Sequence, residues 1–249
     1  MSERIDLHKL KCLSAAHLKI IAMVCMLLDH LWGTVVSGNL WMTCVGRIAF
    51  PIFAFQVAEG YAHTKNFKKY LLRMFLFALV AEIPFNLMSG GWWIHPFGQN
   101  VMFTFCLSLL LIRGIDKARQ KHWALGLAAV VVGAFLGYFV GMFTFVDYYG
   151  YGILMVLVFW LFSDVKFGWL IQLAAMIYIN FEMIGGMHYE FFLFGKSLLF
   201  PTQGFAVLAM IPIWLHNGKR GTNKKWFQYA VYAFYPAHML ILSLIAMLR

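Results

Sequence analysis

Asp29 and His30 stand side by side at the end of an apolar run that begins at Leu18 and is suited to a bilayer. Ionisable groups inside a membrane are unfavourable there and usually functional. Imidazole changes its protonation near neutral pH, so His30 is suited to act as a general base. Lys19 lies eleven residues before His30, which is close to three helical turns, so both residues are expected on one helix face, roughly 16 Å apart. A cation at the mouth and an imidazole deeper on the same face predict a pathway through the protein.

Further polar residues are scattered through the apolar segments. An unpaired ion is disfavoured in hydrocarbon, so Arg47 is expected to pair with Asp29 or Glu82. Asn86 and Asn100 are expected to cap helix ends. A polar network that only fixes helix packing is the alternative to a functional cluster. The set comes from six predicted helices and comprises Asp29 and His30, Arg47, Glu82 and Asn86, Asn100, Asp147, and His238.

A second polar group follows the next apolar segment. Glu59 and His63 are spaced i, i+4, and Gln56 lies one turn before Glu59, so the three share a helical stripe. This pattern is typical of a helix end at the membrane surface, but it also suits an anion site for a phosphorylated donor. Three lysines that follow at once would complete such a site: Lys65, Lys68 and Lys69.

The composition sets the fold class that must position these groups. The 249 residues are 62% hydrophobic and only 12% charged, against about 25% charged in soluble domains. Repeated apolar stretches near 20 residues predict an all-α, polytopic membrane protein. Residues 1–249 are expected to form a single transmembrane domain, with 1–16 as an interfacial segment. The nine predicted spans cover about 17–37, 42–62, 68–88, 100–115, 122–141, 148–162, 166–184, 198–215 and 228–248.

The distribution of basic residues predicts the orientation. Nearly all Lys and Arg residues fall on alternate connections, so the positive-inside rule places the N-terminus in the cytoplasm and the C-terminus outside. The net charge of +10 is therefore assigned to topology and not to nucleic acid. Most of the intramembrane polar residues then map to the outer half of the membrane. The four cysteines lack CxxC spacing and the nine histidines lack an HExxH motif, so no disulfide framework and no metal site are expected.

Several segments resemble the TraX family of membrane proteins. They are LKIIAMVCMLLDH in the first span, the run from Gly46 to Asn86, NVMFTF from Asn100, DYYGYGIL from Asp147, and YAFYPAHMLIL from Tyr232. The resemblance implies a bacterial plasma-membrane acyltransferase that takes acetyl groups from cytoplasmic acetyl-CoA. The implied acceptor is extracytoplasmic, either a pilin or peptide N-terminus or a surface glycan. Membrane acyltransferases of surface sugars are more distantly similar, with a basic residue and a His at comparable spacing in the first span.

Acyl transfer gives each candidate residue an expected role. His30 is the expected base, with Asp29 or another carboxylate orienting it, and Arg47 or an Asn amide is expected to steady an oxyanion or a carboxylate. Lys19 and the basic cytoplasmic groups would hold the nucleotide, while the thioester arm follows the Lys19–His30 face. Direct transfer and an acetyl-His relay are both open.

Two other functions fit the same residues. A proton-coupled transporter would use Asp29, His30, Glu82 and His238 as a relay. A non-catalytic membrane assembly protein would need them only to lock its helices together.

Overall fold

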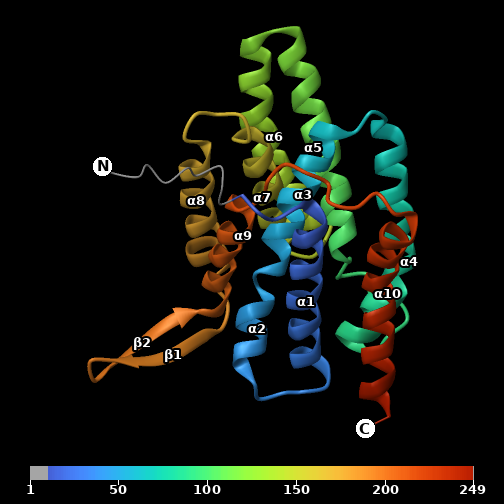
Figure 1. Ribbon diagram of the computed structural model, residues 1–249, viewed down its shortest axis with the longest axis vertical. Helices are drawn as coiled ribbons and strands as arrows, with labels where there is room; N and C mark the ends of the chain where they lie inside the picture. Colours follow the sequence, from blue (N-terminus) through green and yellow to red (C-terminus); the bar gives the residue numbers. More distant parts are fainter. Residues whose placement is uncertain (1–10, 249) are drawn as a thin grey trace.

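The computed structural model describes residues 11–248, which form a bundle of helices with one small hairpin at its side (Figure 1). The predicted interfacial segment therefore lies largely outside the described residues. The helices and strands in chain order are α1 (Ala15–Thr34), α2 (Leu40–Gly46), α3 (Ala49–His63), α4 (Phe67–Gly90), α5 (Val101–Lys121), α6 (Trp123–Phe143), α7 (Tyr149–Leu161), α8 (Gly168–Tyr178), the π-helix η2 (Ile179–Ile184), β1 (His188–Leu193), β2 (Lys196–Pro201), the 3₁₀-helix η3 (Thr202–Ala209), α9 (Met210–Trp214) and α10 (Lys225–Met247).

The chain is a membrane protein by the length and composition of its helices. Among residues 11–248, five helices are long and apolar enough to cross a membrane: α1, α2 with α3, α4, α6 and α10. Three shorter apolar helices cover 149–161, 168–184 and 202–214. The predicted spans coincide with these eight segments and with α5, but only five of the nine meet the length and composition expected of a crossing helix.

A two-stranded antiparallel sheet corrects the all-α prediction. Strands β1 and β2 pair in a register that leaves Phe194 and Gly195 as a two-residue turn. Both turn residues have positive φ, at 49° and 75°, as the tight hairpin turns that match strand twist require. The predicted eighth span, 198–215, was therefore wrong over its first four residues, which belong to β2.

The core lies where α3, α5 and α7 meet. Ile52, Leu109, Ile112 and Met155 in these helices are all buried. On the side of α7, helix α6 packs closely because it presents glycines: a Cβ on Gly141 would lie 2.6 Å from backbone atoms of α7. Small residues on one face let membrane helices approach in this way.

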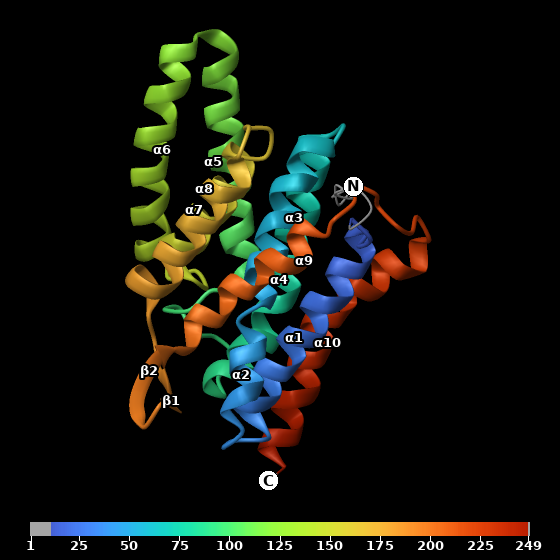
Figure 2. The same cartoon turned by 60° about the vertical axis from the view of Figure 1, so that its left-hand side comes forward.

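Helix α10 returns at the end of the chain to lie beside α1 and α4 (Figures 1 and 2). The connections α3–α4, α5–α6, α7–α8 and α9–α10 lie toward the upper end of Figure 1. The connections α1–α2 and α4–α5, the hairpin and the C-terminal end lie toward its lower end. Most basic residues are therefore gathered at one end, the end at which α1 begins.

Candidate functional site

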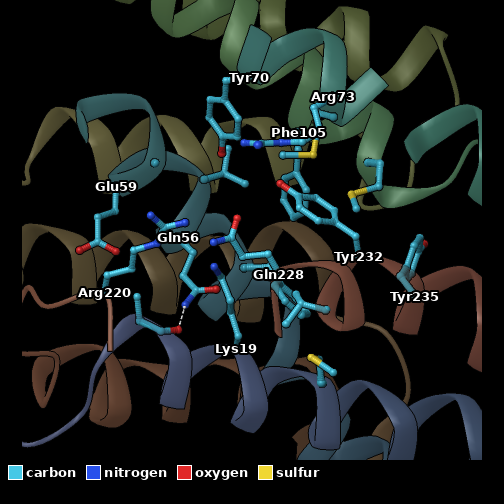
Figure 3. Close-up of a pocket in the computed structure, with 18 of the residues that line it drawn as sticks. Lys19, Gln56, Glu59, Tyr70, Arg73, Phe105, Arg220, Gln228, Tyr232 and Tyr235 are labelled. Atoms are coloured by element: carbon cyan, nitrogen blue, oxygen red, sulfur yellow. Dashed lines mark hydrogen bonds between the residues drawn. The ribbon is translucent and has the colours of Figure 1, made fainter. Parts of the chain in front are cut away.

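A cavity of about 500 Å³ lies between α1, α3, α4 and α10 (Figure 3). On α1 its wall includes Lys19, Met23 and Met26, spaced four and three residues apart. His30 is the next residue on this stripe, one turn beyond Met26 and about 6 Å further along the axis. The predicted face of the first span is therefore the face that borders the cavity.

The wall contributed by α3 includes the polar stripe predicted for the second span. Gln56, Glu59 and His63 all line the cavity, and the side chain of Gln56 donates a hydrogen bond to the carbonyl of Ala15 at 2.8 Å. Of the residues predicted to bind a donor, Lys19, Glu59 and His63 border the cavity. The remaining three do not line it and are exposed at the start of α4: Lys65, Lys68 and Lys69.

Two arginines at the cavity were missed by the sequence reasoning. Arg73 comes from α4 and Arg220 from the α9–α10 connection. Both point into the same space as Lys19 in Figure 3. Tyr70 also lines the cavity, and residues i and i+3 share a helix face, so this spacing was the signal that the sequence offered for Arg73.

Beyond the inner end of the cavity, two imidazoles form a direct pair. Nδ1 of His30 lies 2.7 Å from Nε2 of His238, and the rings stack with centroids 4.9 Å apart. Nδ1 of His238 lies 2.6 Å from the carbonyl oxygen of Phe234. A carbonyl only accepts, so His238 donates from Nδ1 and accepts at Nε2 when neutral. His30 then donates from Nδ1, which leaves the lone pair on its Nε2 available as a base.

The ring of His30 does not itself line the cavity. Phe234 does line it and stacks on His238 with a centroid distance of 4.6 Å. Three stacked rings, Phe234, His238 and His30, therefore lead from the cavity wall to the candidate base.

Asp29 does not orient His30, contrary to the expectation. Its carboxylate accepts from Arg47 Nη2 at 2.8 Å and from the Thr43 hydroxyl at 2.6 Å. Among residues 11–248, no carboxylate contacts His30, and the imidazole of His238 takes the orienting place. The guanidinium of Arg47 holds a carboxylate, which was one of its two expected roles.

Glu82 belongs to a different pair. Its carboxylate accepts from the backbone N–H and the side-chain amide of Asn100, at 3.2 and 2.6 Å. The alternative pairing of Arg47 with Glu82 was therefore wrong, since Arg47 pairs with Asp29. Asn100 caps α5 as expected, because its side chain accepts from the N–H of Met102.

Asn86 and Asp147 complete the predicted set. Asn86 does not end a helix, because α4 continues to Gly90; it is buried and donates to the carbonyl of Trp93 at 3.4 Å. Asp147 lies before α7, and its carboxylate accepts from the N–H of Tyr148. The predicted outer cluster is thus divided into separate pairs, and only His30 and His238 of the proposed proton relay touch each other.

No group of three or more His, Cys, Asp or Glu residues within the described part of the chain could hold a metal ion. The cysteines among these residues are all free.

Comparisons with known proteins support the resemblance to the TraX family. The family described as "TraX protein" matches residues 14–246. A probable fimbrial assembly protein FimC of serogroup H1 from Dichelobacter nodosus is 26% identical over 260 residues, covering 97% of each chain. No solved structure matches the chain. Because the family match extends over nearly all of the sequence, this membrane protein belongs to the TraX family.

Proposed function

We propose that this protein is a bacterial plasma-membrane acyltransferase that moves an acetyl group from cytoplasmic acetyl-CoA to an extracytoplasmic amine or hydroxyl. The acceptor is a peptide N-terminus of a pilin-type subunit or a surface glycan. The observation that carries the proposal is the pair His30–His238. It lies one helical turn beyond a cavity whose mouth is lined by basic residues. The fimbrial name of the relative supports an acceptor of the pilin type.

In the proposed reaction His30 is the base. Its Nε2 takes the proton of the acceptor amine or hydroxyl as that atom attacks the thioester carbonyl carbon. The bond between the carbonyl carbon and sulfur breaks, and the CoA thiolate leaves with the proton from the imidazolium. His238 holds the ring through Nδ1 and fixes the tautomer that makes Nε2 basic.

The route of the donor follows from the cavity. The nucleotide stays at the basic mouth of the cavity, and the flexible arm passes along Lys19, Met23 and Met26 toward His30. Phe234 borders both the cavity and His238, so the arm reaches the base by displacing this ring. The proposed topology has nine crossings, with the N-terminus in the cytoplasm and the C-terminus outside.

The test is acetyl transfer from radiolabelled acetyl-CoA in membranes that contain the protein. His30→Gln should lower the initial rate at least 100-fold, since a positioned general base contributes typically 10²–10⁴-fold. His122→Gln is the matched control, because this exposed histidine caps α6 away from the cavity. Unchanged transfer by His30→Gln would remove His30 from the mechanism.

A non-catalytic assembly role is the second candidate, because the related Dichelobacter nodosus protein is named for fimbrial assembly. Under that role the polar pairs only lock helices together, and acetyl-CoA does not stabilise the protein. A ligand at 100 times its Kd stabilises a native state by about 2.7 kcal/mol. Thermal unfolding with saturating acetyl-CoA therefore separates the two candidates: an unchanged midpoint favours assembly.

A further inference from the structure

We propose that Lys19, Arg73 and Arg220 form a phosphate-recognition site at the mouth of the cavity. The site takes a ligand that carries at least two phosphate charges and an apolar or flexible arm. The proposal rests on the proposed function only for naming that ligand as the acyl donor; the charge and shape of the cavity carry the rest.

The first observation is unbalanced positive charge. Lys19, Arg73, Lys219 and Arg220 all line the cavity, and none of them lies within 4.0 Å of a carboxylate in residues 11–248. Arg73 and Arg220 are exposed, and Lys19 is half-buried beneath them. Several cations gathered without counter-ions at one end of a cavity form a site for a multiply charged anion.

The second observation is that the acidic residue of the wall is already engaged by a partner outside the basic group. Glu59 accepts from Nε2 of His216 at 2.7 Å, and Nδ1 of the same ring lies 3.0 Å from the carbonyl oxygen of Leu13. The carboxylate of Glu59 is therefore held by a histidine that is itself anchored on the segment before α1. It lies within 4.0 Å of His216 and of none of the lysines and arginines at the mouth of the cavity in residues 11–248.

The third observation is the support of Arg73. Its guanidinium lies 5.4 Å from the ring centroid of Tyr232 and 5.9 Å from that of Tyr70. Aromatic faces hold a guanidinium without removing its charge or its fork of donors. Figure 3 shows Arg73 extending across the cavity toward Tyr70, with Lys19 pointing toward it from the opposite wall. The guanidinium is therefore arranged to donate two parallel hydrogen bonds to the oxygens of a phosphate.

The inner part of the cavity specifies the rest of the ligand. Met23, Met26, Phe53 and Phe105 line it, all of them apolar. From Lys19 to Met26 the wall runs about 10 Å along α1. A charged head at the mouth and an arm in the apolar depth fit a nucleotide with a pantetheine-like tail. An anionic lipid offers the same chemistry, with a phosphate head group and an apolar chain.

The experiment measures binding by the full-length protein in nanodiscs of phosphatidylcholine. The probes are CoA and adenosine 3′,5′-bisphosphate, and the readout is calorimetry. We expect Arg73→Gln and Arg220→Gln each to weaken binding of both probes at least tenfold. Arg113→Gln is the matched control, since this arginine lies on the basic end of α5 and pairs with Asp116 outside the cavity. The affinity of this variant for both probes should stay within twofold of that of the unmodified protein.

Two further arms identify the source of the phosphate and guard against misfolding. In the first arm, phosphatidylglycerol is added to the nanodisc. If it raises the Kd for CoA tenfold, and does not do so in Arg73→Gln, the result supports the site with a lipid as its occupant. In the unmodified protein the Kd for CoA must rise steeply between 50 and 500 mM salt, which needs no variant. Binding of nucleotide and lipid that ignores Arg73, Arg220 and salt would overturn the site.

The outcome is separable from that of the proposed function. Arginine-dependent binding of CoA without any acetyl transfer would leave the phosphate site standing and remove the acyltransferase. Acetyl transfer at an unchanged rate in Arg73→Gln and Arg220→Gln would leave the acyltransferase standing and remove the phosphate site.

Discussion

Replacing Asp29 by Asn should destabilise the protein by about 2–3 kcal/mol, because it leaves the guanidinium of Arg47 without its carboxylate. Breaking a buried ion pair by removing one partner typically lowers the free energy of unfolding by about 3–5 kcal/mol. The side chains of Arg47 and Asp29 keep 24% and 19% of their exposure, so water recovers part of this loss. The new amide oxygen can still accept from the Thr43 hydroxyl, which is 2.6 Å from the carboxylate.

The assay is denaturant unfolding of the full-length protein in detergent micelles, followed by tryptophan fluorescence. Asp164→Asn is the control, because it makes the same substitution at an exposed position; it should stay within about 0.5 kcal/mol of the parent. The double variant Asp29→Asn/Arg47→Gln should lose less than the sum of the single variants, with a coupling of about 1–2 kcal/mol. A stable Asp29→Asn, or additive losses, would refute the structural role assigned to the pair.

Three other outcomes follow from the structure. Cys12 is exposed just before α1, and the other three cysteines are buried. Under the proposed topology, a membrane-impermeant maleimide should therefore label the protein from the cytoplasmic side only, and labelling of intact cells would contradict that topology. Gly46→Ala should lower stability by about 1–3 kcal/mol, since the added Cβ would lie 2.3 Å from that of Asp29, and an unchanged unfolding midpoint would contradict this contact. Asn100→Ala should lower stability by about 2–4 kcal/mol, because the variant loses the α5 cap and the hydrogen bond from the side-chain amide to Glu82. A loss below about 0.5 kcal/mol would argue against both contributions.

Local periodicity predicted the parts of the site that lie within one helix. Lys19 and the stripe from Gln56 to His63 border the cavity because residues three and four apart share a helix face whatever surrounds them. The same reasoning failed for the three lysines after His63, since their density in the sequence does not say which side of α4 faces the cavity. Arg73, one turn further along that helix, faces it instead.

Partners from distant segments were beyond such reasoning. His30 and His238 are 208 residues apart, and their pairing depends on α10 lying beside α1. The sequence marked both as polar groups in apolar helices but offered no pattern that joins them. For Arg47, the choice between Asp29 and Glu82 likewise depended on which helices are neighbours. The hairpin was missed because its strands carry apolar residues on both faces and lack the alternation that marks a half-buried strand.

The most direct measurement is a cryo-electron microscopy structure of the protein bound to a non-hydrolysable thioether analogue of acetyl-CoA. The proposed mechanism requires the arm to run between α1, α4 and α10, with Phe234 displaced and the acyl carbon within about 4 Å of His30 Nε2. An analogue bound outside the cavity, or one that ends at an undisplaced Phe234, would contradict catalysis at His30.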